Sequence, residues 1–445
     1  MLIKKLKEHV ESNPSSIAVI YKNKKITYLE LWNNILNYYY QINNKYKEDD
    51  IVIVENTNDD NYIYMILALN LKGVISLPID KGEKENKKRL LKKKIGAVDI
   101  VSSLEKKNVN NNTSLNLNNV YSKNKIINIL LSSGSTGEEK LITYTNDNIY
   151  NSITNFHDAY KLGNKINVIV TGPISHAYSL IKVYMAVYYG YTITIHNGAN
   201  FVEFINYIVE DDMNNIMLCT NPTFLHYTAS IFRKELEENI SKIKLIEIAT
   251  APLSINDAEL LVSICNGRTK LINHYGSTEY VPICYKEVDK NYEFGCVGAP
   301  YKNTKIEIID NNLSNCGSIR ISGNSLANYY GKEKSFYFYT GDVGYFKGDD
   351  LYIIDREKNF FNVNGYKISP VEIENAALKY DGILECICCY QNVLTLYVVK
   401  KKEYQIEKLK KKLQSELIDY KIPKKIIETN SIIKLSNGKI DRSKY

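Results

Sequence analysis

Short apolar runs alternate with amphipathic stretches through about the first 270 residues, and this alternation constrains the fold more than any other feature. The runs are rich in valine, isoleucine and leucine, which is typical of buried strands; they lie at residues 51–54, 73–77, 167–170 and 244–248. Between them, residues 28–39 and 61–71 place apolar side chains at helical spacing. Strands that alternate with helices predict an α/β protein.

From about residue 295 the strands become shorter and turns more frequent. Residues 383–390 and 394–399 are expected to be strands, and residues 404–417 a charged helix. We place a domain boundary after residue 355. The sequence therefore predicts a large N-terminal domain at residues 1–355 and a small α+β domain at residues 356–445.

The composition is typical of a soluble globular protein, with 44% hydrophobic and 24% charged residues among 445. A net charge of +7 is modest for this length; it is compatible with nucleotide ligands and does not indicate nucleic acid. The longest apolar stretch, residues 183–195, is too short to span a bilayer and contains Gly190. No secretory signal is visible at the N-terminus, so we expect a cytoplasmic protein without a membrane partner.

Eight cysteines are present, three of them in the run Cys386-Ile387-Cys388-Cys389. A zinc site would need a second pair of ligands at a suitable spacing, and no Cys or His follows this run. We expect thiols buried in a strand, and no disulfide framework.

A loop of small residues is the first candidate for chemistry. Residues 127–131 read as a strand and residues 141–144 as its return. The loop between them supplies hydroxyls, glycines and a lysine, which suit a polyphosphate; it consists of Ser132, Ser133, Gly134, Ser135, Thr136, Gly137 and Lys140. Its spacing is not that of a Walker motif, and by itself such a loop is as often a plain surface hairpin.

Further motifs follow in a fixed order along the chain. They are His274-Tyr275-Gly276-Ser277-Thr278-Glu279, Tyr339-Thr340-Gly341-Asp342, the segment from Arg356 to Lys367, and the segment from Leu435 to Arg442 near the C-terminus. With these motifs the chain resembles the adenylate-forming superfamily of acyl- and aryl-CoA synthetases, luciferases and peptide-synthetase adenylation domains. The resemblance spans nearly the whole chain. It implies mixed sheets flanked by helices, a distorted β-barrel subdomain and a mobile C-terminal lid.

The resemblance also implies which residues bind ATP. The loop at residues 132–140 would hold the β- and γ-phosphates. Thr278 would contact the α-phosphate and Glu279 would ligate Mg²⁺. The remaining nucleotide contacts would surround adenine and ribose; they are Thr250, Ala251, Pro252, Tyr275, Gly276, Asp342 and Arg356. The chain departs from the family pattern at Glu139, where proline is usual, and at Leu141, where glycine is usual.

Lys439 is the residue that the resemblance places at the chemical step. A lysine there would stabilise the negative charge that develops when a carboxylate attacks the α-phosphorus. Lys358 matches the hinge of the family, and Gly365 matches the face that admits the thiol. A swing about Lys358 would present Lys439 for adenylation and then Gly365 for thioester formation.

The acid would lie near residues 173–180, where relatives carry a gating His or aromatic residue; His176 is the candidate, and a core histidine is the alternative. Amino-acid-activating relatives place an aspartate at the position of Ala177, so an acid without an α-amino group is favoured. The remaining expected pocket residues are Tyr178, Ile181, Asn273, His274 and Val281. This mixture favours an aromatic or short unsaturated acid.

The sequence thus predicts an enzyme of biosynthesis or catabolism that uses ATP and Mg²⁺ to convert a carboxylic acid to an acyl-adenylate and pyrophosphate. The acyl group would pass to a phosphopantetheine thiol, on coenzyme A or on a separate acyl or peptidyl carrier protein. Two alternatives stay open: a free-standing amino-acid adenylation domain, and a degenerate nucleotide-binding protein.

Overall fold

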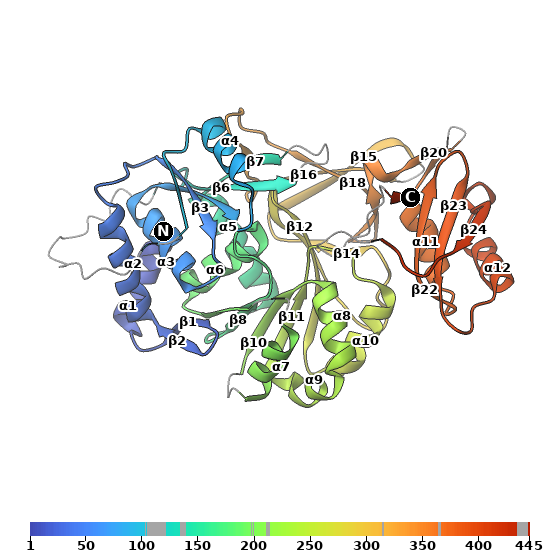
Figure 1. Cartoon of the computed structure of the whole chain (residues 1–445), viewed down its shortest axis with the longest axis horizontal. Coiled ribbons are helices and arrows are strands. Elements are labelled where there is room, and N and C mark those ends of the chain that lie inside the picture. Colours follow the sequence, from blue (N-terminus) through green and yellow to red (C-terminus); the bar gives the residue numbers. More distant parts are fainter. Residues whose placement is uncertain are drawn as a thin grey trace. The chain divides into compact units, whose positions relative to one another are not determined.

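The structure is a computed structural model that describes residues 1–102, 104, 122–133, 139–196, 198, 200–210, 214–313, 316–363, 366–433 and 444–445. The chain divides into two compact units. Unit 1 comprises Met1–Lys305 and Ile321–Phe338, and unit 2 comprises Ile306–Arg320 and Tyr339–Tyr445. Figure 1 labels the elements of both units.

The larger sheet of unit 1 has a parallel centre with antiparallel strands at both ends. Its order is β14-β13-β12-β11-β10-β8-β9-β1-β2, and the strands from β1 to β12 in this order are parallel. The strands are β1 (Ile17–Tyr21), β2 (Lys24–Thr27), β8 (Asn167–Val170), β9 (Thr192–Ile195), β10 (Ile216–Thr220), β11 (Ile243–Ile248), β12 (Lys270–Ser277), β13 (Tyr280–Glu287) and β14 (Cys296–Pro300).

A second sheet of unit 1 has the order β17-β7-β6-β4-β3-β5. Its strands are β3 (Ile51–Asn56), β4 (Ile75–Asp80), β5 (Asp99–Val101), β6 (Ile126–Ser133), β7 (Glu139–Thr145) and β17 (Asn328–Tyr329). Strands β6 and β7 form an antiparallel hairpin. This hairpin carries the candidate phosphate loop at its tip.

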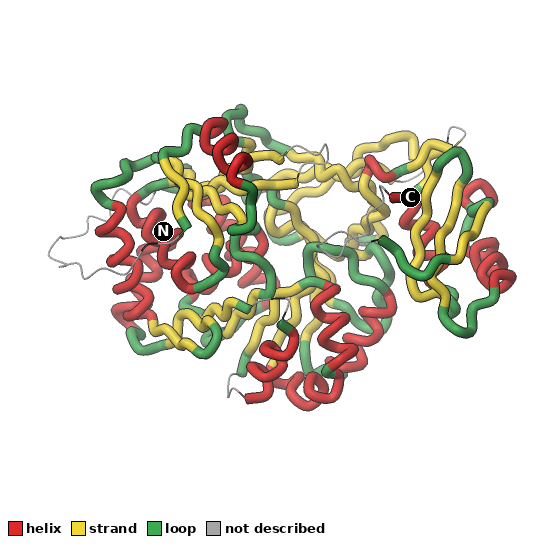
Figure 2. The backbone as a smooth tube through the Cα atoms, in the orientation of Figure 1, coloured by secondary structure: helices red, strands yellow, loops and turns green. Residues whose placement is uncertain are grey.

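Helices cover both sheets (Figure 2). They are α1 (Leu2–Ser12), α2 (Tyr28–Ile42), α3 (Asp60–Lys72), α4 (Glu85–Ile95), α5 (Asn146–Tyr160), α6 (Ala177–Tyr189), α7 (Phe201–Glu210), α8 (Pro222–Ile231), α9 (Arg233–Asn239) and α10 (Ile255–Cys265). Helix α5 contacts β7 of the smaller sheet and β13 of the larger one, and α3 contacts strands of both sheets. A layer of helices therefore lies between the two sheets.

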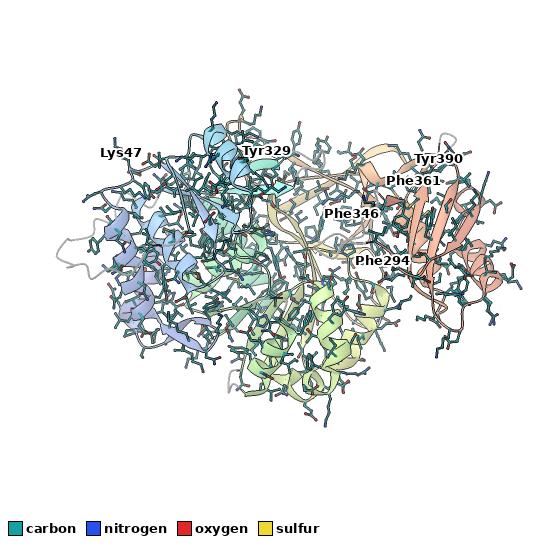
Figure 3. All side chains as sticks on the ribbon, viewed as in Figure 1. Lys47, Phe294, Tyr329, Phe346, Phe361 and Tyr390 are labelled. Carbon is teal, nitrogen blue, oxygen red and sulfur yellow. The ribbon has the colours of Figure 1, made fainter. Side chains whose placement is uncertain are left out.

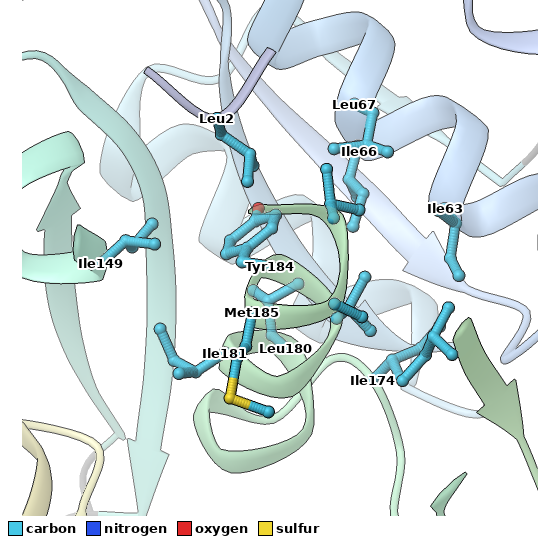
Figure 4. Close-up of a cluster of buried hydrophobic side chains, with 14 of the residues drawn as sticks. Leu2, Ile63, Ile66, Leu67, Ile149, Ile174, Leu180, Ile181, Tyr184 and Met185 are labelled. Carbon is cyan, nitrogen blue, oxygen red and sulfur yellow. The ribbon is translucent and has the colours of Figure 1, made fainter. Parts of the chain in front are cut away.

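Local sequence explains where several of these helices begin and end. Thr27 and Thr145 cap α2 and α5 with capping boxes, in which side chains satisfy backbone groups that the first turn leaves unpaired. Gly190 follows α6 with φ of 75°, a left-handed conformation that glycine adopts without strain. The main core lies around α6, whose buried face packs on α3, α5 and the N-terminal helix. Figure 4 shows Ile181, Tyr184 and Met185 within this core.

Unit 2 has its own core. Its strands are β15 (Thr304–Leu313, from residue 306), β16 (Cys316–Gly323, to residue 320), β18 (Phe338–Lys347, from residue 339), β19 (Asp350–Arg356), β20 (Phe361–Val363), β21 (Tyr366–Ile368), β22 (Ile383–Tyr390), β23 (Leu394–Lys400) and β24 (Lys425–Glu428). Helices α11 (Pro370–Leu378) and α12 (Ile406–Glu416) pack on the sheet of β22, β23 and β24 around Ile373, Leu409 and Leu413. Cys386, Cys388 and Cys389 are buried in β22, as expected.

The α/β class predicted from the sequence is confirmed, because parallel strands alternate with helices through most of unit 1. The distorted barrel is not formed by the described residues, whose strands β15-β16-β18-β19 follow one another in an open order with β15 at the edge. Unit 2 also contains residues that precede the expected boundary at 355. The division into a core at 1–355 and a lid at 356–445 stays a prediction.

Within the residues that the structure describes, no helix is both long enough and apolar enough to cross a membrane.

Candidate active site

The candidate nucleotide residues of unit 1 follow the carboxyl ends of neighbouring parallel strands. Thr250 comes two residues after β11, and Thr278 comes directly after β12. Strands β11 and β12 pair in parallel, with Ile248 opposite Asn273, so their carboxyl ends lie at one edge of the sheet. In open α/β sheets ligands bind beyond this edge. The fold therefore places the two candidate segments where a ligand is expected.

Ser132 and Glu279 join the phosphate-loop hairpin to this edge. Ser132 lies near the end of β6, and its hydroxyl donates a hydrogen bond of 3.2 Å to Oε1 of Glu279. Both residues are buried, with 7% and 8% of their surface exposed. Two motifs that lie far apart in the sequence thus meet at one carboxylate.

The tip of the β12–β13 hairpin is held from behind by Tyr144. Its hydroxyl donates a hydrogen bond of 2.7 Å to the carbonyl oxygen of Thr278. Burial, followed by the charge of Glu279, raises the pKa of Tyr144 well above its ordinary value. Tyr144 therefore stays protonated and keeps donating this bond. The backbone of Thr278–Glu279 is held in place while the Glu279 side chain is turned toward Ser132.

Lys140 lies at the base of the same loop. It pairs with Ser132 across the hairpin, and its ammonium lies 5.4 Å from the centre of the Tyr329 ring. Figure 3 labels Tyr329, which is held beside β7 by pairing of β17 with Ile142. Burial and the charge of Glu279 raise the pKa of Tyr329 to about 12. A neutral aromatic ring is a favourable neighbour for the lysine.

The two departures from the family pattern have structural partners. Glu139 forms an ion pair of 2.7 Å with Lys87 of α4, which also pairs with Glu83 at 2.5 Å. Leu141 is buried in the core that lines α4 and the smaller sheet. Glu139 is therefore ion-paired beside the loop, on a lysine that it shares with Glu83, and Leu141 serves packing.

Thr250 has an unusual backbone. Its φ is 72°, in the left-handed region that β-branched residues rarely adopt. Such strain persists only where the surroundings require it, and it gathers at ligand sites. Thr250 and Pro252 are exposed, Ala251 and Tyr275 are half-buried, and Gly276 is exposed. These residues are therefore open enough to contact adenine, which stays a prediction.

The candidate ribose residues meet within unit 2. Asp342 of β18 faces Arg356 of β19 across the antiparallel pair, and Oδ1 of Asp342 lies 2.8 Å from Nε of Arg356. Arg356 also donates to the carbonyl oxygen of Thr340 at 3.2 Å. The Asp342 carboxylate is thereby buried in a fixed orientation. Lys358, the expected hinge, is an exposed residue of a short 3-10 helix, Glu357–Asn359.

His176 is not a core histidine. Its side chain is 62% exposed at the start of α6, and Nε2 lies 3.6 Å from Oδ2 of Asp80 at the end of β4. Ser175 donates to the other oxygen of Asp80 at 2.6 Å. The contact with His176 holds the pKa of Asp80 below its usual value. His176 thus stands at the surface, where it could face an incoming ligand. Ala177 beside it is buried and carries no charge.

The other expected acid-pocket residues divide into two sets. Ile181 and Val281 are buried in the hydrophobic core, and the amide of Asn273 donates to Tyr292 and to the carbonyl of Cys296. These three residues have partners inside the protein. Tyr178 and His274, in contrast, stack on each other with ring centres 5.7 Å apart. The structure therefore brings Tyr178 and His274 together; their role toward an acid stays a prediction.

Lys182, Glu247 and Lys87 were not singled out from the sequence. Lys182 and Glu247 form an ion pair of 2.6 Å without any exposed surface. A signal was present, because each charge interrupts an apolar run, one in α6 and one in β11. Lys87 gave no such signal within its charge-dense helix.

Several predicted residues lie outside the described part of the chain. They are Gly134, Ser135, Thr136, Gly137, Gly365 and Lys439. The side chain of Ser133 is likewise not described. The roles expected of these residues stay predictions.

Known proteins share both the sequence pattern and the fold. The 2-succinylbenzoate–CoA ligase of Staphylococcus aureus (strain Newman) is 27% identical over 354 residues, which cover 75% of this chain and 68% of the ligase. The ligase of strain MRSA252 is 26% identical over 352 residues, with the same two shares covered.

Two solved structures have a similar fold. One is O-succinylbenzoate coenzyme A synthetase (MenE) from Bacillus subtilis in complex with ATP and magnesium, with a TM-score of 0.79, 19% identity, and 99% and 98% of the two chains covered. The other is ATP-bound MatB from Rhodopseudomonas palustris, with a TM-score of 0.85, 18% identity, and 100% and 98% covered. The family model for AMP-binding enzymes matches residues 81–330, more than half of the chain. The protein therefore belongs to the AMP-binding enzyme family.

Proposed function

We propose that the protein activates a carboxylic acid with ATP, forming an acyl-adenylate and pyrophosphate, and then transfers the acyl group to the thiol of coenzyme A. The observation that carries this proposal is the contact of Ser132 with Glu279. It brings a loop suited to a polyphosphate next to a buried carboxylate, which is the arrangement that a magnesium nucleotide needs. The relatives named as CoA ligases support the choice of acceptor.

The donor atoms present fit Mg²⁺. Glu279 offers carboxylate oxygens and Ser132 a hydroxyl, and Mg²⁺ prefers hard oxygen ligands from a carboxylate, water and nucleotide phosphates. When bound, the ion would neutralise charge on the phosphates and polarise them toward attack. We therefore assign Glu279 as its protein ligand in this proposal.

The chain's own residues would orient the reactants and stabilise the charge that develops. In the proposed reaction a carboxylate oxygen of the acid bonds to the α-phosphorus, and the bond from this phosphorus to the pyrophosphate oxygen breaks. The loop at residues 132–140 would hold the leaving pyrophosphate. Thr278 would contact the α-phosphate, Asp342 and Arg356 the ribose, and Lys439 the developing negative charge. The thiolate of coenzyme A would then attack the acyl carbon and release AMP.

The proposal is tested by acid-dependent exchange of labelled pyrophosphate into ATP. The panel should contain aryl acids, short acyl acids and amino acids, and coenzyme A should be added to the best substrate. We expect exchange with an acid that lacks an α-amino group, and a thioester once coenzyme A is present. Exchange with amino acids alone would favour the amino-acid adenylation alternative. Absence of exchange with every acid would contradict the proposal.

A transfer to a separate carrier protein is the competing second step. A carrier protein bearing phosphopantetheine can be offered in place of coenzyme A after the adenylate has formed. A much faster transfer to the carrier would replace coenzyme A as the acceptor and would leave the first step unchanged.

A further inference from the structure

A lysine and a glutamate are buried together below the candidate acid-binding residues. Lys182 of α6 and Glu247 of β11 lie 2.6 Å apart, from Nζ to Oε2, and neither side chain has exposed surface. Removing two charges from water is costly, and their mutual attraction returns this cost only when the remaining polar atoms are also hydrogen-bonded. An apolar pair of similar volume would fill this space at lower cost. The pair therefore calls for a reason other than packing.

The carboxylate is only half satisfied. Lys182 donates to Oε2 of Glu247, while Oε1 is buried without a hydrogen-bond partner in the described part of the chain. Buried acceptors in native proteins are nearly always paired, and an unpaired carboxylate oxygen is among the costliest exceptions. An acceptor of this kind is explained if a donor arrives from outside the chain.

The surroundings of the pair are mostly aromatic. The Tyr178 hydroxyl is a neutral donor beside Glu247: burial, then the charge of the Glu247 carboxylate and a hydrogen bond to that side chain, raise the pKa of Tyr178 well above its ordinary value. Among the described residues no donor meets hydrogen-bonding geometry at Oε1 itself. The ammonium of Lys182 lies 3.0 Å from the centre of the Phe156 ring and 5.6 Å from that of Tyr160. The Tyr160 hydroxyl bonds to Tyr301 at 2.5 Å, and Tyr301 lies 3.3 Å from Nδ1 of His274. These polar groups satisfy one another. The site is therefore a ring-lined environment with one unmet acceptor.

Charge states around the pair favour a neutral ligand group. Burial, followed by the charge of Lys182, holds the pKa of His274 well below its usual value, so this imidazole is neutral. Burial and the charge of Glu247 raise the pKa values of Tyr160 and Tyr301 well above the ordinary one. Lys182 is thus the cation nearest to Glu247, and a second cation would be repelled by it. A neutral O–H or N–H group fits best.

Tyr178 offers the route to the pair. It is half-buried, its ring stacks on His274, and its hydroxyl reaches the carbonyl oxygen of Glu247 at 3.5 Å. This distance is at the limit of a hydrogen bond, so the bond costs little to break. The Tyr178 ring lies 5.4 Å from the Lys182 ammonium. A turn of the Tyr178 side chain would uncover both charged groups to a ligand that enters beside His274.

We infer that Lys182 and Glu247 select the acid, and that Oε1 of Glu247 accepts a hydrogen bond from a neutral donor on the acid, remote from the carboxylate that is activated. The substrate class is an aryl acid with a ring hydroxyl or ring amino group. Lys182 is a positioning residue, because its ion pair of 2.6 Å fixes the orientation of the Glu247 carboxylate. This inference rests on the proposed function, and it adds the group by which the acid is recognised.

The test compares matched acids in pyrophosphate exchange. The panel is benzoate with each of its ring-hydroxylated and ring-aminated isomers. For the wild-type protein we expect at least one substituted isomer to exceed benzoate in kcat/KM by about tenfold or more, mostly through KM, because an unmet buried acceptor is paired only by that isomer. The double variant Lys182→Met with Glu247→Gln removes both charges together. It should bring the ratio of kcat/KM for the best substituted isomer to kcat/KM for benzoate close to one.

Two further variants keep the test decisive. Glu247→Gln alone is measured in the same way in case the double variant fails to fold, which thermal unfolding reports. Tyr184→Phe is the matched control. It removes a buried hydroxyl of the same helix, one that donates to Asn128 instead of to the ion pair. Its ratio of kcat/KM between the substituted isomer and benzoate should equal that of the wild type. In all folded variants the KM for ATP should be unchanged.

The outcomes separate the inference from the proposed function. A ratio that stays at the wild-type value in the double variant, or a wild-type protein that prefers benzoate to every substituted isomer, would overturn the inference alone. Lack of exchange with all acids in the wild type would overturn the proposed function and this inference with it.

Discussion

The hydroxyl of Ser132 donates to Oε1 of Glu279 at 3.2 Å, across 147 positions of the sequence. Ser132 lies near the end of a strand of the smaller sheet, and Glu279 sits in the turn between two strands of the larger one. One hydrogen bond thus connects the two sheets of unit 1 at the point where the proposed phosphates and metal ion meet. The contact also orients the carboxylate before any ligand arrives, which lowers the cost of binding.

Glu279→Gln should therefore be severely impaired. The amide keeps the volume and accepts the bond from Ser132, but it lacks the charge that Mg²⁺ requires. We expect pyrophosphate exchange to fall by about a hundredfold or more, with a higher requirement for Mg²⁺. Exchange measured against a titration of Mg²⁺ checks this. Ser132→Ala is the control, and it should lose less than Glu279→Gln; equal exchange in Glu279→Gln and the wild type would remove Glu279 from the metal site.

Lys87 should protect ATP binding from the charge of Glu139. In Lys87→Gln the carboxylate of Glu139 loses its 2.7 Å partner beside the loop, so we expect the KM for ATP to rise roughly threefold to tenfold at low salt and less at high salt. The double variant with Glu139→Gln should return the KM to near its original value. Arg89→Gln, on the same helix, removes an exposed pair with Glu85 instead. An equal rise in Arg89→Gln would show a general charge effect and contradict the specific one.

Local patterns explain why most of the fold could be predicted. The runs expected at residues 51–54 and 167–170 are β3 and β8, and the stretch expected at 28–39 is α2. Each was visible because periodicity and caps depend on neighbouring residues. The order of motifs also indicated that Ser132 and Glu279 belong to one site.

Pairs that form only when distant elements pack were not predictable in this way. Lys182 and Glu247 meet because a side chain of α6 reaches β11 in the folded protein, and no local pattern reports that contact. Lys87 meets Glu139 because α4 lies beside the hairpin. The open order of the strands near residues 306–356 likewise depends on pairings between strands that the sequence does not reveal.

Tyr184 should make the protein less stable in alkali. Burial raises its pKa to about 12, whereas an unfolded chain ionises near pH 10. Between these values the unfolded chain releases the proton and the folded one keeps it. The contribution of Tyr184 to the free energy of unfolding is therefore fully present below about pH 10. It falls by on the order of 2–3 kcal/mol as the pH rises toward about 12.

Urea unfolding of the wild type and Tyr184→Phe at several pH values checks the contribution of Tyr184. The variant loses its bonds to Asn128 and Asn70, so it should be less stable at neutral pH by about 1 kcal/mol. This difference should shrink and then reverse between about pH 10 and pH 12, because only the wild type loses the roughly 2–3 kcal/mol linked to ionising residue 184. Tyr227→Phe changes an exposed ring. Its free energy of unfolding should differ from that of the wild type by the same amount at every pH. A constant difference for Tyr184→Phe would contradict the assignment.

Lys439→Ala should separate binding from chemistry. A positive charge that acts on oxygens gaining negative charge in the transition state contributes to the rate much more than to ground-state binding. We therefore expect exchange to fall by about a hundredfold to a thousandfold, while the dissociation constant for ATP, measured calorimetrically, changes little. Gly365→Leu is the counterpart: it should spare exchange and slow formation of the CoA thioester. Unchanged exchange in Lys439→Ala would remove this lysine from the adenylation step, and equal losses of both half-reactions in both variants would contradict a lid that presents different residues for the two steps.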